Sequence, residues 1–141
     1  MKILVGTDGS NPALKAVKYA ARLAGGTRAA SVITLVSVHD DTALRHAEHF
    51  VGRQAVEDYL RALSDKDLAR ARRHLDQAGI RHDMVIRTGH VASEIVALAT
   101  RGKFDLVVVG SKGRSALGDL LVGSVAQRVA ALAKVPVLIV K

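Results

Sequence analysis

Short runs of branched apolar residues constrain the fold of this chain more than any other feature of its sequence. Five of them, each short enough to form one strand, lie at Lys2–Gly6, Ser31–Val38, Arg81–Thr88, Phe104–Gly110 and Val135–Lys141. Two of them contain unbroken apolar cores, Leu-Val-Val-Val at 106–109 and Val-Leu-Ile-Val at 137–140. A strand that is apolar on both faces is typical of a parallel sheet covered by helices on each side.

Helical patterns occupy most of the intervals between these runs. The first begins at Ser10 or Asn11 as the cap, with Pro12 in the first turn, and is predicted to stop at Gly25-Gly26. The others are expected at about 54–78, before Gly79, at about 92–100, before Gly102, and from near Ser124. The polar segment 39–53 is interpreted as a loop or a frayed helix start. Alternating strands and helices predict an α/β fold, a single doubly wound Rossmann-like domain over residues 1–141.

Length and composition exclude several classes of protein. The chain has 141 residues, of which 49% are hydrophobic and 24% charged, which suits one soluble globular domain. It contains no cysteine, which excludes disulfide scaffolds, cysteine-ligated zinc, iron–sulfur clusters and thiol catalysis. The amino terminus reaches Asp8 too early for a signal peptide, and no apolar run approaches the ~20 residues needed to span a bilayer. We therefore expect a cytoplasmic protein with no membrane partner.

The net charge of +8 would attract phosphates, nucleotides, nucleic acids or anionic lipid. Only 3% of the residues are aromatic, which disfavours the stacking surfaces of single-strand or RNA-binding modules. The basic run at 70–74 is interpreted as a solvated helix face, because Ala71 and Leu75 point inward and no aromatic residue is interleaved. A nucleic-acid partner is accordingly not expected.

A glycine-rich segment follows the fourth strand and leads into the last helix. In a doubly wound sheet, ligands bind beyond the carboxyl ends of the strands, and Gly110 and Gly113 lie at such an end. Glycine lets backbone amides approach a phosphate closely, and Gly123-Ser124 stands at a helix amino terminus, where amides and the helix dipole favour an anion. The segment is neither a Walker A loop nor a Gly-x-Gly-x-x-Gly fingerprint. The alternative is that the glycines only form a tight turn and Ser124 only caps a helix.

The spacing Gly-x₂-Gly-x₉-Gly-Ser formed by these residues resembles the nucleotide-binding signature of the universal stress protein family. The resemblance covers nearly the whole chain, from Lys2-Ile3-Leu4-Val5-Gly6-Thr7-Asp8-Gly9-Ser10, through Thr88-Gly89, to Val135-Pro136-Val137-Leu138-Ile139-Val140. It implies five parallel strands in the order 3-2-1-4-5, and a homodimer that pairs the last strands, here Val137–Val140. Family members that carry the glycine signature tend to bind ATP, so the resemblance places this chain in the ATP-binding branch.

The resemblance also assigns roles to individual residues. The phosphates and the ribose would be contacted by Gly110, Gly113, Gly123 and Ser124, with the backbone amide of Val125. Asp8 would hold the nucleoside, its alternative role being to cap the first helix, and the backbone of Val38 would read the adenine edge. Lys112 and Arg114 match variable loop positions and would face the phosphates. We expect ATP or another adenine nucleotide as the ligand, together with Mg²⁺.

Catalytic and metal sites are less well supported by the sequence. Ser111, Ser115 and Ser124 could lie near a γ-phosphate, but no base is evident, so at most slow ATP hydrolysis or autophosphorylation is expected. His46 and His49 share a helical face without a third ligand, and His39 is expected at the rim of the adenine site.

The function expected from the sequence is an ATP-binding universal stress protein that acts as a nucleotide-responsive regulator in stress adaptation. The alternatives are a dimeric interaction module that works without a nucleotide, or a slow ATPase or autokinase. Bound ATP would order the loop between Gly113 and Gly123 and so present or hide a surface.

Overall fold

Five parallel strands lie side by side in the order β3-β2-β1-β4-β5 in the computed structural model, which confirms the predicted sheet. The structure describes residues 1–40, 42–113 and 122–141, without the side chain of residue 43. The strands are β1 (Lys2–Gly6), β2 (Val32–His39), β3 (His82–Thr88), β4 (Leu106–Gly110) and β5 (Val137–Val140). Each lies within two residues of the run that predicted it.

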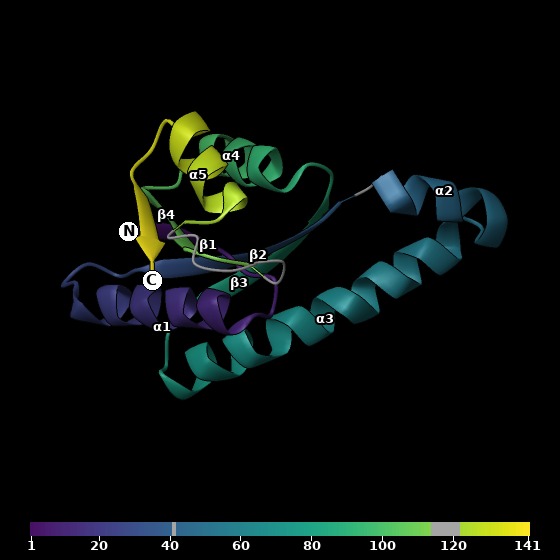
Figure 1. Cartoon of the computed structure of the whole chain (residues 1–141). Helices are drawn as coiled ribbons and strands as arrows, with labels where there is room; N and C mark the ends of the chain where they lie inside the picture. Colours follow the sequence, from purple (N-terminus) through teal and green to yellow (C-terminus); the bar gives the residue numbers. More distant parts are fainter. Residues whose placement is uncertain (41, 114–121) are drawn as a thin grey trace.

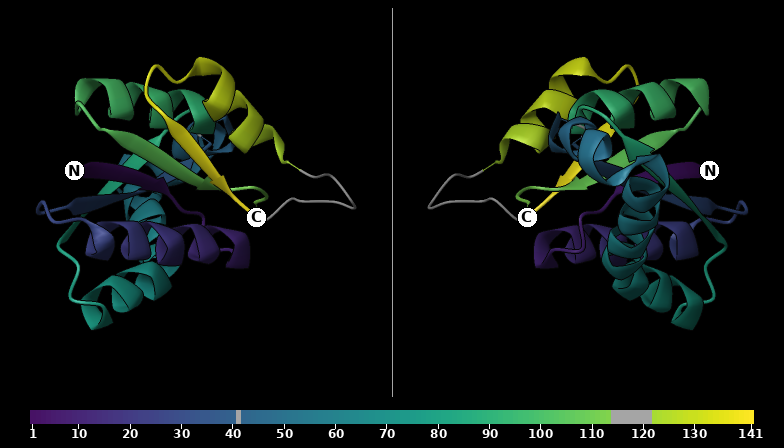
Figure 2. Two further views of the ribbon diagram at one scale, coloured as in Figure 1. Left: turned by 90° about the vertical axis from the view of Figure 1, so that its left-hand side faces the viewer. Right: turned by 90° about the vertical axis from the view of Figure 1, so that its right-hand side faces the viewer.

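Helices cover both faces of the sheet, as expected from its apolar strands. One face carries α1 (Asn11–Gly26) and α3 (Arg53–Gln77), and the other carries α4 (Val91–Arg101) and α5 (Ser124–Leu132), below and above the sheet in Figure 1. Figure 2 shows the same layers from the two sides. No helix within the described ranges has both the length and the apolar character needed to cross a membrane.

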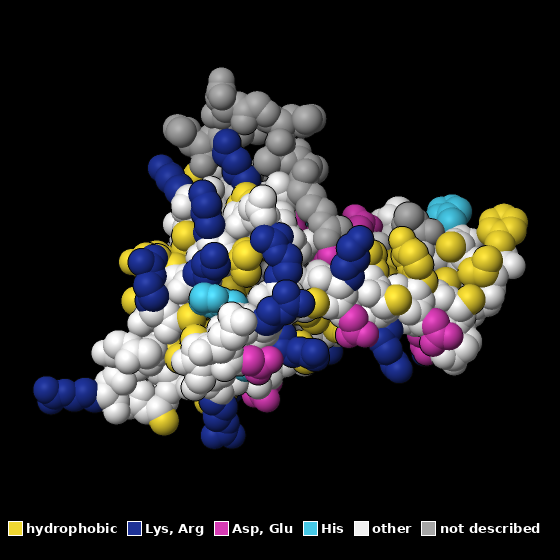
Figure 3. Space-filling view, turned by 90° about the horizontal axis from the view of Figure 1, so that it is seen from below, with side chains coloured by type: hydrophobic (Ala, Val, Ile, Leu, Met, Phe, Trp, Pro, Cys, Tyr) yellow, Lys and Arg dark blue, Asp and Glu magenta, His cyan; other side chains and the backbone are white. Residues whose placement is uncertain are grey.

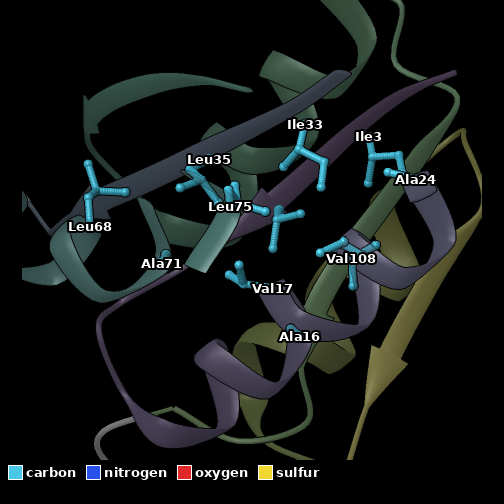
Figure 4. Packing of buried hydrophobic residues seen from close by; sticks show 13 residues of the cluster. Ile3, Ala16, Val17, Ala24, Ile33, Leu35, Leu68, Ala71, Leu75 and Val108 are labelled. Carbon is cyan, nitrogen blue, oxygen red and sulfur yellow. The ribbon is translucent and has the colours of Figure 1, made fainter. Parts of the chain in front are cut away.

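The hydrophobic core is split into two clusters by the sheet. On one face, Ile3 and Val5 of β1 pack with buried residues of α1 and α3. Figure 4 shows this cluster, with Ile3 of β1, Val17 of α1 and Leu75 of α3 labelled. On the other face, Leu4 of β1 packs with buried residues of α4 and α5. The three β1 side chains are 0% exposed, because successive residues of a strand point to opposite faces. The unbroken apolar runs are thus explained by burial on both sides.

Helix α1 begins and ends where the sequence predicts. The Ser10 hydroxyl accepts a hydrogen bond from the Ala13 amide at 3.3 Å and caps the helix, with Pro12 in its first turn. The predicted stop at Gly25-Gly26 is confirmed, because the helix ends at Gly26 and Thr27 is its C-cap. The Thr27 hydroxyl donates to the Ala24 carbonyl at 3.0 Å and satisfies one of the last carbonyls of the helix.

The segment interpreted as a loop or a frayed start contains a helix, α2 (Thr42–Val51), which corrects that interpretation. It packs against α3 and lies beyond the edge of the sheet in Figure 1, with Leu44 and Ala47 half-buried and Phe50 88% exposed. The amide of Thr42 donates to the Asp40 carboxylate at 2.9 Å, and this bond lowers the pKa of Asp40. Ionised Asp40 therefore holds the first turn of α2 in place.

Gly102 at the end of α4 is a position where an added side chain meets packed atoms. A Cβ built there would clash with a ring carbon of Phe104 and would lie 3.0 Å from the Leu98 carbonyl oxygen. Phe104 is only 7% exposed, so its ring has little room to move. We expect Gly102→Ala to lower the free energy of unfolding by about 1–3 kcal/mol, measured by urea denaturation.

Gly26→Ala is the matched control for this prediction. Gly26 lies within α1, and a Cβ there meets no atom within 4 Å. Because alanine favours a helix over glycine, we expect an unchanged or higher free energy of unfolding, by up to about 1 kcal/mol. Equal midpoints for the two variants would contradict the packing argument at Gly102.

Candidate functional site

A cavity of about 460 Å³ opens at the carboxyl ends of β1, β2 and β4. The winding of the sheet reverses between β1 and β4, which is where doubly wound folds bind ligands. The amino-terminal ends of α4 and α5 complete its walls. Its volume lies within the range of about 300–1,000 Å³ that is usual for small-molecule sites.

One end of the cavity is apolar. Val36 and Val38 of β2 line it together with Val109 of β4, and Val91 and Ile95 of α4 close its far side. Val36 and Val109 belong to the core cluster beneath α4 and α5, which fixes the position of this wall. Such an apolar slot suits a flat aromatic base rather than a charged group.

The other end of the cavity is polar and is built from the glycine segment. The amide of Ser111 donates to the Val140 carbonyl at 2.8 Å, and the amide of Gly123 donates to the Ser111 carbonyl at 2.6 Å. These bonds hold the start of α5 beside the end of β4. The N-cap residue Gly123 has no side chain that could cap α5, and Ser124 and Val125 line the cavity. A helix amino terminus in this setting favours an anion.

Close approach, rather than an unusual turn, explains the three glycines of the signature. None has a φ in the left-handed region. A Cβ at Gly110 would lie 2.9 Å from the Pro12 carbonyl, one at Gly113 would lie 3.1 Å from Asp8 Oδ2, and one at Gly123 would lie 3.2 Å from the Ser111 carbonyl oxygen. A left-handed turn therefore does not explain why glycine stands at these three positions. Gly110 serves the packing of β4 on α1, whereas Gly113 and Gly123 shape the cavity wall.

Asp8 is not the cap of α1, since Ser10 has that role. The Oδ1 atom of Asp8 accepts a hydrogen bond from the Ser10 amide at 3.0 Å, and Oδ2 faces Gly113. The carboxylate thus lies between the end of β1 and the glycine segment, on the cavity lining. In this position it can accept hydrogen bonds from the hydroxyl or amino groups of a bound molecule.

The structure brings most of the residues selected from the sequence to this one cavity. Its lining includes Asp8, Val38, Gly110, Lys112, Gly113, Gly123, Ser124 and Val125. Arg114 and Ser115 lie outside the described residues.

Sequence reasoning missed part of the lining, chiefly Thr7 after β1 and the pair Val91 and Ile95 on α4. These two residues are four positions apart at the start of a helix that follows the end of a strand. This spacing is the signal that could have identified them as part of the site.

The prediction that His39 lies at the rim of the adenine site is wrong. Its Nε2 atom lies 2.7 Å from the Ser64 hydroxyl of α3 and 3.2 Å from the Ser37 hydroxyl, and His39 does not line the cavity. Neighbouring residues of a strand point to opposite faces, so with Val38 in the cavity His39 turns toward α3. This contact explains how Ser64 can be 0% exposed.

The histidines of α2 do not lie near the cavity lining. His49 borders a separate hollow with Arg45, Glu48 and Arg53, and His46 Nδ1 donates to the Thr42 carbonyl at 3.2 Å. Across the described part of the chain, no three His, Asp or Glu side chains are grouped so that they could hold a metal ion.

Comparison with known proteins gives a consistent result along the whole chain. The model of the universal stress protein family matches residues 1–141. Universal stress protein MJ0531 of Methanocaldococcus jannaschii is 32% identical over 141 residues, which cover 99% of this chain and 81% of the relative.

Two solved structures share the fold. Hypothetical protein MJ0577, also of Methanocaldococcus jannaschii, has a TM-score of 0.84 at 28% identity, covering 99% of this chain and 94% of that one. A universal stress protein described in complex with cAMP has a TM-score of 0.65 at 30% identity, covering 100% of this chain and 96% of its own.

Proposed function

Because the chain belongs to the universal stress protein family, we propose that it binds ATP with Mg²⁺ in the cavity at the ends of β1, β2 and β4. The observation that carries this proposal is that the glycines of the signature line one cavity together with Asp8 and Lys112. In the cytoplasm the protein would act as a nucleotide-responsive regulator in stress adaptation.

The apolar end of the cavity supports an adenine base as the ligand's buried part. Val36, Val38 and Val109 offer flat aliphatic surface, and burying such surface is favourable by roughly 25 cal/mol per Å². The backbone of Val38 would supply polar contacts to the edge of the base. The relative described with cAMP also carries an adenine, which adds to the support for this base.

The polar end supports a chain of phosphates. The glycine segment, the start of α5 and Lys112 all line the cavity. Each favours negative charge, which supports the binding of phosphate groups here. Asp8 is the one acid among the described lining residues, and we assign it to the nucleoside. Mg²⁺ would therefore be held chiefly by the phosphates, as is usual for this ion.

The proposal is tested by mass spectrometry of small molecules released when the purified protein is denatured. A preformed anion site at a helix amino terminus can retain its ligand through purification, so we expect ATP or ADP in the extract. Addition of ATP and Mg²⁺ to stripped protein should raise the melting temperature. The gain in stability is about 2.7 kcal/mol at a hundredfold excess over the Kd.

The same protein, incubated with γ-labelled ATP, separates binding from turnover. Label that stays on ATP supports a regulator, whereas free phosphate or a labelled serine would favour the slow ATPase or autokinase. An empty protein whose melting temperature does not respond to ATP would contradict the proposal and favour an interaction module that works without a nucleotide.

A further inference from the structure

A row of cations runs along the exposed side of α1. Lys15, Lys18 and Arg22 are all exposed, and their spacing of three and four residues places them on one stripe of the helix. The sequence of α1 contains no acidic residue, so nothing within the helix neutralises this row. Tyr19 lies between the cations, with its ring 4.9 Å from the Arg22 guanidinium carbon.

A second row follows the carboxyl-terminal half of α3. Lys66, Arg70 and Arg73 are exposed and again spaced four and three residues apart. Between Lys66 and Gln77, all of which the structure describes, Asp67 is buried and Asp76 is the one exposed acid. The carboxylate of Asp76 lies 3.6 Å from His82 Nε2 at the start of β3.

The two rows are joined into one surface, which we name the basic face: Lys15, Lys18, Arg22, Lys66, Arg70 and Arg73. Both amino groups at the end of the Arg70 guanidinium donate to Asn11 Oδ1 at 3.1 Å, which ties α3 to the start of α1. Helix α1 leads into β2 and α3 leads into β3, two parallel strands that begin at the same end of the sheet. The two helices, and with them the two rows, therefore run in the same direction. Figure 3 shows this side of the molecule, with Lys and Arg side chains spread over it and few acidic ones between them.

We propose that the basic face binds the phosphate backbone of a nucleic-acid duplex without reading its sequence. This revises the expectation of a solvated surface, which considered α3 alone and not the row on α1 beside it. Packed helices lie about 8–10 Å apart, and the grooves of B-form DNA are about 6 and 12 Å wide. Two rows of long cations on neighbouring helices can therefore reach phosphates on both strands that border a groove.

The chemistry of the face favours a duplex over the other polyanions. Single strands are usually held by stacking of their bases on aromatic rings, and the aromatic side chain on this face, Tyr19, is already in contact with Arg22. Attachment to a membrane surface is strengthened by large apolar side chains between the cations. The exposed residues of α1 between its cations offer none beyond Tyr19. Contacts with phosphates need only the cations that are present.

The test is fluorescence anisotropy of a labelled 20-base-pair DNA duplex titrated with the whole protein between 50 and 200 mM salt. If all six cations of the basic face contact phosphates, the fourfold rise in salt weakens binding about 2,000-fold. Lys15→Ala/Lys18→Ala/Arg22→Ala removes half of these contacts. We expect about 500-fold weaker binding of this variant at 0.1 M salt, and a loss of only about 40-fold over the same salt range.

The control variant removes as much charge from the opposite face of the sheet. Arg101→Ala/Lys103→Asn/Lys134→Ala alters exposed cations at the ends of α4 and α5, and Lys103 has a φ of 51° that asparagine tolerates. This control should bind like the wild type. Lys66→Ala/Arg73→Ala tests the second row independently and should weaken binding about 60-fold at 0.1 M salt.

Three results would overturn the proposal. They are no binding of the duplex at 50 mM salt, equal losses in the control and in the α1 variant, and binding to vesicles of phosphatidylserine without binding to the duplex. The last result would assign the basic face to an anionic membrane surface. Circular dichroism melting of each variant verifies that it is folded, which is expected because alanine favours exposed helix positions.

Discussion

Replacement of Gly123 by valine is expected to weaken ATP binding at least about 100-fold. The first carbon of the new side chain would already lie 3.2 Å from the Ser111 carbonyl oxygen and 3.5 Å from the Lys112 Cα, and valine adds two methyl groups beyond it. The start of α5 must then move away from the end of β4. Two or three charge-assisted hydrogen bonds to the phosphates, each worth about 1.5–3 kcal/mol, would be lost. Isothermal titration with ATP and Mg²⁺ measures the effect directly.

Two further variants make this result specific to the site. Asp8→Ala removes the carboxylate between β1 and the glycine segment and should also weaken binding, by about tenfold or more. Gly26→Ala changes a glycine with no atom within 4 Å of the new carbon, at the far end of α1, and should bind ATP like the wild type. A Gly123→Val protein that is folded and binds ATP as tightly as the wild type would refute the assignment of the phosphates to this segment.

The sheet could be predicted because its strands are buried on both sides. Val107 and Val108 are both 0% exposed although they point to opposite faces, and only an unbroken apolar run satisfies that demand. The order of the strands came from the family resemblance and is confirmed by the structure. Pattern alone leaves several orders open, because every strand has the same apolar signature.

Helix α2 could not be predicted because the sheet does not bury it. It packs mainly against α3, with Leu44 and Ala47 only half-buried, and its apolar stripe is short and interrupted by histidines. The end of α1 could be predicted because two consecutive glycines carry a cost in helix propensity. The helix ends at Gly26, and the Thr27 hydroxyl satisfies the carbonyl of Ala24 one turn earlier.

The candidate site could be predicted where its residues are close together in the sequence. Gly110 to Val125 form one segment, and their spacing is unusual enough to be noticed. Val91 and Ile95 come from a helix whose sequence resembles any amphipathic helix, so they could only be placed with the fold in hand. The error at His39 arose from a shift of one residue along β2, which reverses the direction of a side chain.

The second large effect is expected at β5, the edge strand through which we propose that two copies pair. The carbonyls of Pro136 and Val140 accept hydrogen bonds from the Val107 and Ser111 amides, so alternate residues of β5 face β4. Val137 and Ile139 therefore direct their backbone N–H groups to the open edge. Such an apolar edge is a liability in a monomer, and antiparallel pairing with a second copy covers it.

Ile139→Pro should turn the dimer into a monomer while leaving the bonds between β4 and β5 in place. Proline removes an N–H group that faces the open edge, which is where an edge strand tolerates it. The substitution occurs twice in a symmetric interface, so two carbonyl groups lose their N–H donor. Together this costs about 2–6 kcal/mol and weakens the affinity of the two copies at least about thirtyfold. Light scattering after size exclusion should give the 14.9 kDa of one chain, in place of twice that mass for the wild type.

Ile139→Ala separates the backbone from the side chain at this position. Alanine removes most of the side chain but keeps the backbone N–H group. At the same protein concentration, a larger fraction of this variant than of the proline variant should therefore be dimeric. If the alanine and proline variants dissociate equally, the apolar side chain rather than strand pairing holds the two copies together. A wild-type protein that remains a monomer at high concentration would show that β5 is not the interface.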